Sequence, residues 1–197
     1  MRESITIALI IGSLRKDSIN RKFAEYVVSQ MPSGVTINEV NIADLPLYNQ
    51  DYDGTTIDSY ERVRQQLKAA DAVLIVTPEH NRTMPAALKN VIDIASRPYK
   101  QSVWADKKVA VMTASPSSYG GINSGLDVRK SMQMLSAQMM IRPEVHLSRA
   151  TDSLNEDGSV SERTQKYLQK FVEAFVDFVA IADSRDADSN NVGRTGA

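Results

Sequence analysis

Hydrophobic residues follow two alternating spacings along the chain, and these spacings predict its secondary structure. Short runs of consecutive apolar, largely β-branched residues are typical of strands buried on both faces of a sheet. Between the runs, apolar residues recur at steps of three and four, which predicts amphipathic helices. The predicted strands are 5–11, 35–40, 72–77, 108–113 and 144–147. The predicted helices are 19–30, 60–70, 85–95, 125–139 and 161–182.

Strand and helix therefore alternate five times, which predicts an α/β fold with a doubly wound, five-stranded parallel sheet and helices on both faces. We expect a single domain over 1–182 with the strand order 2-1-3-4-5. In that order the loops after the first and third strands flank the point where the strand order reverses, and ligands of such sheets bind there. The segment 183–197 is rich in Ser, Asp, Asn and Gly, so we expect a disordered tail.

The loop after the first strand is polar and leads directly into a helix. Its polar candidates are Ser13, Arg15, Ser18 and Asn20. A helix N-terminus offers free backbone N–H groups and the positive end of the helix dipole, and arginine can bind phosphate through paired N–H groups. The pattern favours a monophosphate site. The alternative is a plain strand-to-helix turn in which Asp17 or Ser18 only caps the helix.

Two further polar loops follow the third and fourth predicted strands. The first is Pro78-Glu79-His80-Asn81, and the second is the glycine-bearing segment 115–121 with Ser115, Tyr119 and Gly120. Because parallel strands end at one edge of the sheet, these loops are expected to lie beside the first one. The 78–81 loop has no glycine, so we expect a rigid loop that presents backbone N–H groups, with Glu79 pointing to solvent or to a partner subunit. His80 either hydrogen-bonds a ligand or is a surface side chain, and His146 is expected to be structural.

Composition removes several classes of function. A chain of 197 residues with 42 % hydrophobic residues can form one ordinary core. The formal net charge of -1 does not indicate binding to nucleic acid or to an anionic membrane. The chain has no cysteine, which excludes thiol catalysis and disulfides, and its two histidines without a carboxylate cluster make no metal site. The apolar runs are too short to span a bilayer, so we expect a cytoplasmic protein.

The three loops carry motifs that resemble those of the NAD(P)H-dependent FMN reductase family of flavodoxin-like quinone, chromate and azo-dye reductases. The matching motifs are Gly-Ser-Leu-Arg at 12–15 with Ser18 and Asn20, Thr-Pro-Glu-His-Asn at 77–81, and Pro85 through Leu-Lys-Asn at 88–90 to Asp93. The likeness covers about 4–180. The family usually has tyrosine where this chain has His80 and often has tryptophan where it has Ile94.

The resemblance implies a flavodoxin-like fold with non-covalently bound FMN and with NADPH or NADH as co-substrate. It implies that the phosphate lies among the polar residues of the first loop, and that the flavin ring lies between Pro78, Glu79, His80 and Asn81 on one side and the 115–121 loop on the other. Flavin supplies the chemistry, so no side chain is assigned as a catalytic acid or base. Electrons would pass by a ping-pong mechanism from NAD(P)H to quinone, free flavin, azo or metal-ion acceptors.

The family also implies a homodimer or homotetramer with the flavin near a subunit boundary. We expect the helix after Pro85 to present a mixed surface to the partner, formed by Lys89, Asn90, Val91, Ile92 and Asp93. The alternative function is a flavodoxin-type electron carrier or a non-catalytic flavin-binding module. Carriers usually have a strongly acidic surface, so the near-neutral charge favours the enzyme. A Ser or Thr hydrolase is not favoured, because the chain has no G-x-S-x-G motif.

Overall fold

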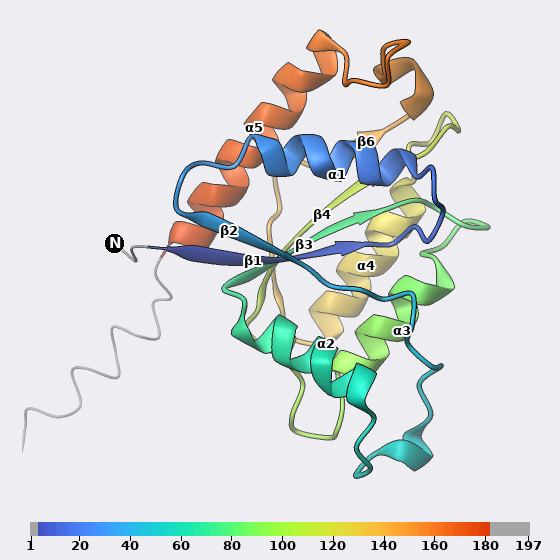
Figure 1. The fold of residues 1–197 in the computed structure, drawn as a ribbon, viewed down its shortest axis with the longest axis vertical. Coiled ribbons are helices and arrows are strands. Elements are labelled where there is room, and N and C mark those ends of the chain that lie inside the picture. Colours follow the sequence, from blue (N-terminus) through green and yellow to red (C-terminus); the bar gives the residue numbers. More distant parts are fainter. Residues whose placement is uncertain (1–3, 182–197) are drawn as a thin grey trace, which may run out of the picture.

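The computed structural model describes residues 4–181, and its centre is a parallel sheet between two layers of helices (Figure 1). The strands are β1 (Ile5–Ile11), β2 (Val35–Glu39), β3 (Ala72–Thr77), β4 (Lys108–Ala114), β5 (Gln138–Met139) and β6 (Val145–Leu147). The strands pair in the order β2-β1-β3-β4-β5, and β6 also pairs with β4. The predicted fold class and strand order are therefore confirmed.

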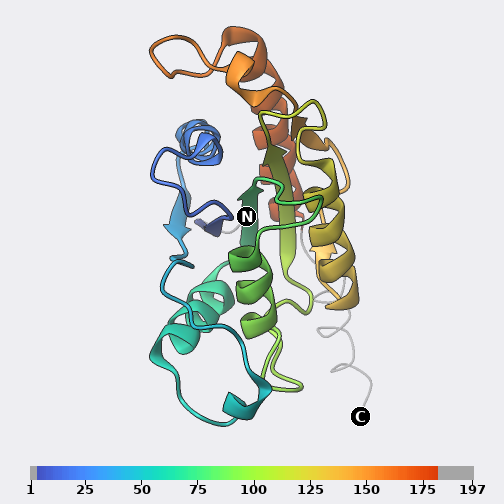
Figure 2. The same cartoon turned by 90° about the vertical axis from the view of Figure 1, so that its right-hand side faces the viewer.

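Alternate residues of the central strands supply the two cores on either side of the sheet. In β1, Ile7 and Leu9 belong to one core, whereas Ala8 and Ile10 belong to the other. This division follows from the two-residue period of a strand. The helices α1 (Ile19–Ser29) and α5 (Glu162–Ala180) cover the first face, and α2 (Asp58–Ala69), α3 (Ala86–Ala95) and α4 (Ile122–Met134) cover the second (Figure 2). No helix within residues 4–181 is long and apolar enough to cross a membrane.

The fifth position in the sheet is divided between two short strands, and the helix before them ends earlier than predicted. The helix predicted to reach Met139 ends at Met134, because Ser136 adopts a left-handed φ of 60°. The N–H groups of Ser136 and Ala137 then close the last turn onto helix carbonyls. The released chain forms β5 against the start of β4, while β6, close to the predicted 144–147 strand, pairs with its end. The last helix ends at Ala180, and the predicted tail lies outside the described residues.

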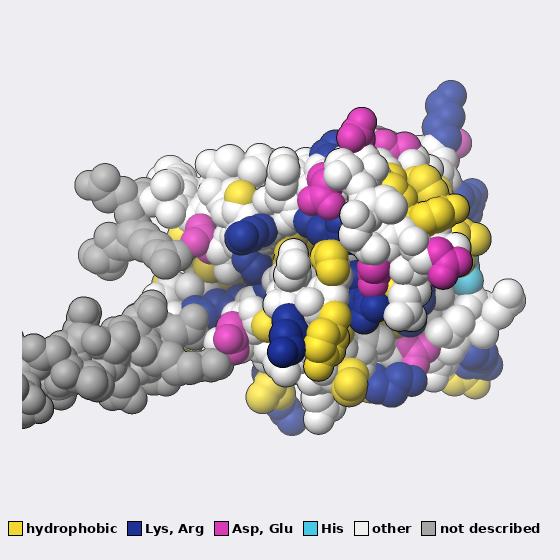
Figure 3. Space-filling model, turned by 90° about the horizontal axis from the view of Figure 1, so that it is seen from below, with side chains coloured by type: hydrophobic (Ala, Val, Ile, Leu, Met, Phe, Trp, Pro, Cys, Tyr) yellow, Lys and Arg dark blue, Asp and Glu magenta, His cyan; other side chains and the backbone are white. Residues whose placement is uncertain are grey.

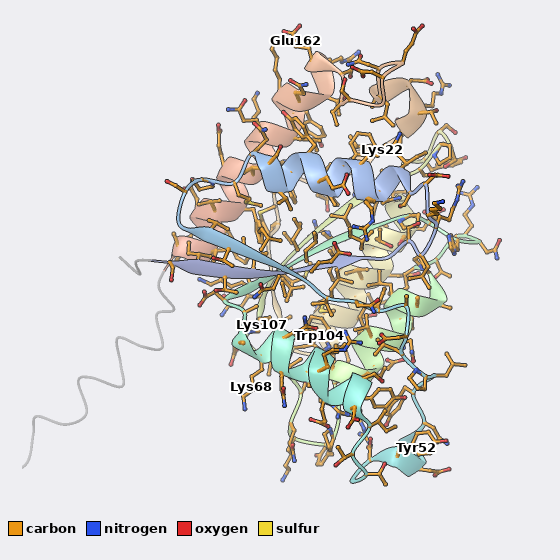
Figure 4. All side chains as sticks on the ribbon, viewed as in Figure 1. Lys22, Tyr52, Lys68, Trp104, Lys107 and Glu162 are labelled. Carbon is orange, nitrogen blue, oxygen red and sulfur yellow. The ribbon has the colours of Figure 1, made fainter. Side chains whose placement is uncertain are left out.

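Two neighbouring lysines fasten the start of β4 to helices on opposite faces. The ammonium of Lys107 donates to the carbonyl of Ala70 at the end of α2. The ammonium of Lys108 donates to the carbonyl of Val179 near the end of α5 at 3.1 Å. Both positive charges complement the negative ends of helix dipoles, and burial lowers the pKa of Lys107. Figure 4 shows Lys107 near Lys68 and Trp104 beside α2. The two lysines thus attach the start of β4, opposite the polar loops, to α2 and α5.

Helix α3 contributes to the core rather than presenting the predicted mixed surface. Val91 and Ile92 are buried, which contradicts that prediction. Asn90 is also buried, and its Oδ1 accepts a hydrogen bond from the backbone N–H of Tyr48 at 2.8 Å. It thereby pins the long 44–56 loop, which contains the short 3₁₀ helix η1 (Gln50–Tyr52), against α3. The residues of the predicted surface that keep substantial exposure are Lys89 and Asp93, which form an ion pair at 2.7 Å.

Candidate functional site

The loops after β1, β3 and β4 leave the sheet side by side. The N–H of Gly12 donates to the carbonyl of Val76 at 2.8 Å, so the first loop starts against the end of β3. Thr77 is in register with Thr113, which places the second and third loops at the same level of the sheet. All three loops therefore lie at one edge, as predicted (Figure 1). The predicted site residues are brought together there, with Ser13, Arg15, Ser18 and Asn20 in or just after the first loop.

The first loop presents a free guanidinium beside the N-terminus of α1. Ser18 is the N-cap of α1, and its Oγ accepts a hydrogen bond from the N–H of Arg21 at 3.2 Å. The capping alternative is thus correct for this hydroxyl. Arg15 is exposed, and no carboxylate among residues 4–181 forms an ion pair with it. The first-turn amides of α1 have no acceptor within the helix. The loop therefore keeps its anion-binding donors although Ser18 is engaged.

Gly12 and Asn20 fix the shape of the first loop through contacts with the strands β3 and β4. A Cβ on Gly12 would lie 2.3 Å from Oγ1 of Thr77, so only glycine permits this approach between β1 and β3. Asn20 is buried, and its side-chain amide donates to the carbonyl of Ala114 at 3.1 Å. Its Oδ1 is a buried atom without a hydrogen-bond partner in the described structure. The Asn20 side chain thus joins α1 to the end of β4, and its backbone N–H is the group that remains for an anion.

The second loop is a tight two-residue turn. The backbone of His80 and that of Thr83 exchange hydrogen bonds of 2.9 and 3.0 Å, and Asn81 and Arg82 between them have positive φ values of 49° and 68°. Positive φ at both central residues is the hallmark of a type I′ turn. The expected rigidity is therefore present, although it comes from these hydrogen bonds as well as from the lack of glycine. The His80 side chain is exposed.

The carboxylate of Glu79 is bound by α4 of its own subunit, which corrects the expectation that it points to solvent or to a partner subunit. Its Oε2 accepts hydrogen bonds from the backbone N–H of Asn123 at 2.9 Å and of Ser124 at 3.4 Å, and its Oε1 accepts one from the side-chain amide of Asn123 at 3.2 Å. The carboxylate thus caps the N-terminus of α4, where a negative charge is stabilised. This contact joins the second loop to the helix that follows the third loop.

A buried chain of hydrogen bonds shapes the third loop. The hydroxyl of Thr113 donates to the carbonyl of Gly120 at 2.6 Å and lies 2.8 Å from Nδ1 of His146. Because the hydroxyl proton is used, Nδ1 carries the hydrogen of the second bond. Nε2 of His146 is buried without a partner among the described residues, and burial lowers the pKa of the ring. His146 is structural, as expected, and it supports the loop through Thr113.

Close backbone packing explains the glycines of the third loop. Gly120 has a φ of 63°, and a Cβ there would lie 2.8 Å from the carbonyl oxygen of His146. Ser115 is buried and organises its own loop, because its Oγ accepts the N–H of Ser117 at 3.2 Å. Tyr119 is 56 % exposed. A rigid wall of backbone with one exposed aromatic ring therefore faces the second loop.

Thr113, Asn123 and Arg82 are absent from the predictions for this site. Thr113 contacts His146, 33 positions away, and Asn123 donates to Glu79, 44 positions away. Arg82 lies at the tip of the second loop. The one sequence signal for its conformation is the preceding asparagine, a residue that tolerates positive φ. Within residues 4–181 no cluster of three or more His, Cys, Asp or Glu residues is arranged to hold a metal ion.

The donor set fits a flat, phosphate-bearing cofactor. Arg15 and the α1 amides suit a phosphate monoester, and the two rigid loops beyond them present backbone to a planar ring. At Gly12 and Gly120 a Cβ would collide with neighbouring atoms, so these glycines allow the loops to pack closely at this edge. Together with the parallel order β2-β1-β3-β4-β5, these features define a flavodoxin-like binding site at the switch point of the sheet.

Comparison with known proteins identifies the family. The family model "NADPH-dependent FMN reductase" matches residues 5–152. A quinone reductase of Pseudomonas putida is 40 % identical over 182 residues, which are 92 % of this chain and 98 % of that protein. A 2-hydroxy-1,4-benzoquinone reductase of Burkholderia sp. is 39 % identical over 177 residues, which are 89 % of this chain and 97 % of that protein.

A solved structure agrees with these matches. FerB, a flavoenzyme NAD(P)H:acceptor oxidoreductase of Paracoccus denitrificans, has a TM-score of 0.83 and 37 % identity and covers 89 % of this chain and 97 % of that chain. The chain belongs to the NADPH-dependent FMN reductase family. It is therefore a flavin-dependent oxidoreductase that uses FMN and NAD(P)H, as the motifs of the three loops indicate.

Proposed function

We propose that this protein reduces quinones and related acceptors with NAD(P)H through non-covalently bound FMN in a ping-pong mechanism. The observation that carries the proposal is Arg15 at the N-terminus of α1, exposed and without an ion pair within residues 4–181, in a chain of this family. Free flavin, azo compounds and metal ions are further candidate acceptors. When bound, FMN supplies two-electron chemistry, taking hydride from NAD(P)H and giving electrons to the acceptor.

The protein's own residues bind and orient in this proposal. Arg15, Ser13 and the first amides of α1 hold the phosphate, with Ser18 and Asn20 keeping that turn in shape. The backbone of Pro78, Glu79, His80 and Asn81 would contact one side of the flavin ring, and Ser115, Tyr119 and Gly120 would contact the other. The turn closed by His80 and Thr83 holds this loop in place, and its remaining backbone N–H groups would stabilise negative charge on the flavin. No side chain is assigned as an acid or base.

The mixture of charges on the surface favours an enzyme over an electron carrier. In Figure 3 the face viewed from below shows acidic, basic and hydrophobic side chains interspersed, with no acidic patch dominating it. The whole chain has 23 basic and 24 acidic residues. A carrier that docks redox partners through an acidic surface needs a charge imbalance. The even mixture therefore supports small-molecule acceptors over protein partners.

Steady-state kinetics test the reductase and its mechanism. With NADH or NADPH and 1,4-benzoquinone, free FMN or a ferric chelate, we expect turnover and parallel double-reciprocal lines as the acceptor concentration is varied. Parallel lines arise because NAD(P)⁺ leaves before the acceptor binds at the same face. Intersecting lines would contradict the ping-pong order. Negligible NAD(P)H oxidation with every acceptor would favour the electron carrier or binding module.

We infer that the protein works as a homodimer or homotetramer in the cytoplasm. The family resemblance supports assembly near the flavin. The predicted mixed α3 surface does not support it, because Asn90, Val91 and Ile92 are buried within the subunit. Exposed apolar side chains on α4, namely Ile122, Leu126 and Met134, are better candidates for the contact. Sedimentation that shows only monomer at micromolar concentration would refute the assembly.

A further inference from the structure

A cation–π contact between Arg82 and Tyr119, called the bridge below, links the second loop to the third. The guanidinium carbon of Arg82 lies over the ring of Tyr119, 4.4 Å from its centroid. Arg82 belongs to the turn after β3, and Tyr119 belongs to the loop after β4. Both side chains are at the surface, and Tyr119 is 56 % exposed. The bridge therefore joins the two loops that would enclose the flavin ring.

Rigid turns hold both ends of this bridge. Arg82 has a left-handed φ of 68°, and the two backbone hydrogen bonds between His80 and Thr83 close its turn. The hydroxyl of Thr83 also donates to Asp127 of α4 at 2.5 Å. On the other side, Gly120 follows Tyr119 with a φ of 63°. The two turns therefore fix the backbone positions of Arg82 and Tyr119. The long side chain of Arg82 is exposed and can change its rotamer.

The positive charge of Arg82 is not neutralised inside the described structure. No carboxylate among residues 4–181 forms an ion pair with it. Two nearby carboxylates are engaged elsewhere: Glu79 caps α4, and Asp127 binds Lys130 at 2.8 Å as well as Thr83. Hydrogen bonds from Lys130 and Thr83 hold the pKa of Asp127 below its usual value. An exposed cation–π contact shifts a population only about twofold to fivefold, so the guanidinium can leave Tyr119 or bind a second group at its edge.

We propose that Arg82, stacked on Tyr119, selects acceptors whose planar ring carries a negative charge, such as hydroxylated quinones. This inference rests on the proposed function. The hydroxyl of 2-hydroxy-1,4-benzoquinone is conjugated to a carbonyl as a vinylogous acid and is ionised at neutral pH. Its charged oxygen lies beside a carbonyl oxygen, and this pair matches the fork of N–H donors on a guanidinium. The phenol ring of Tyr119 contacts the guanidinium, and no carboxylate among residues 4–181 forms an ion pair with it, so its N–H donors can bind the quinone oxygens.

Equilibrium dialysis of the oxidised, FMN-loaded protein without NAD(P)H tests the selection directly. The probes are 2-hydroxy-1,4-benzoquinone and neutral 1,4-benzoquinone, and the chain has no cysteine thiol to add to them. For Arg82→Gln we expect the Kd of the charged quinone to rise about threefold to fivefold, the upper range for an exposed charge pair, with the Kd of the neutral quinone unchanged. Tyr119→Leu should show part of this loss. Lys68→Gln, which removes an exposed positive charge from α2, should bind both quinones as the unaltered protein does.

Turnover with the same two quinones gives a second readout. The ratio of kcat/KM for the charged quinone to that for the neutral one should fall in Arg82→Gln by a similar factor, and salt should lower the same ratio in the unaltered protein. An unchanged Kd ratio in Arg82→Gln overturns the selection. Binding that follows the pattern above without any turnover overturns the proposed function and leaves the selection standing.

Discussion

Arg15→Ala is expected to weaken FMN binding by about 1.5–3 kcal/mol, the range for a hydrogen bond to a charged group. Arg15 is exposed and without an ion-pair partner among residues 4–181, so its donors are available to a phosphate. Truncation leaves the α1 amides in place, which is why we expect weakened rather than abolished binding. Quenching of flavin fluorescence on titration into the cofactor-free protein measures the change.

Two variants separate the guanidinium from general charge. Arg15→Lys keeps the positive charge but loses the paired donors, so its affinity should fall between that of Arg15→Ala and that of the unaltered protein. Lys22→Ala removes the same charge from the exposed side of α1 and should bind FMN normally. If Arg15→Ala retains full affinity, the phosphate binds elsewhere.

Glu79→Ala is expected to lower the free energy of unfolding by about 1–2 kcal/mol, the range for losing a helix cap. Three donors at the start of α4, two of them backbone N–H groups, lose their acceptor in this variant. Because Glu79 joins the second loop to the helix after the third loop, we expect FMN affinity to fall as well. Urea unfolding of the cofactor-free protein measures the first effect, and an FMN titration measures the second.

Glu79→Gln is the matched control for the cap. Glutamine keeps one acceptor oxygen but loses the negative charge that the helix dipole favours, so its loss of stability should be the smaller of the two. Equal stability of Glu79→Ala and the unaltered protein would show that the carboxylate does not support α4.

The parts of the fold that the sequence predicted are those with a local signal. Six of the seven residues of β1 and five of the six residues of β3 are apolar, which indicates buried strands without knowledge of their neighbours. The two-residue β5 has no periodicity of its own, and the apolar Met139 extended the helical pattern through Ser136. From the sequence, Val91 and Ile92 are predicted on the surface, whereas both are buried in α3. The spacing of apolar residues in one helix does not show how wide its buried face is.

For the site too, the sequence predicted the features that have a local signal and missed those that depend on the assembled fold. Polar residues after buried strands located the three loops, because the carboxyl edge of a parallel sheet follows from topology. The partners within the site did not follow, since Glu79 and Asn123, or Thr113 and His146, meet only when the sheet is assembled. The bridge between Arg82 and Tyr119 depends on two left-handed turns whose joint geometry no local pattern encodes.

Anaerobic reduction of the FMN-loaded protein by NADPH or NADH tests the central claim most directly. We predict that the purified protein retains FMN, that the visible absorption of the bound flavin bleaches on addition of an equimolar amount of NAD(P)H, and that it returns when 1,4-benzoquinone is added. A protein that binds no FMN, or whose bound flavin stays oxidised in excess NADPH and NADH, would contradict the account.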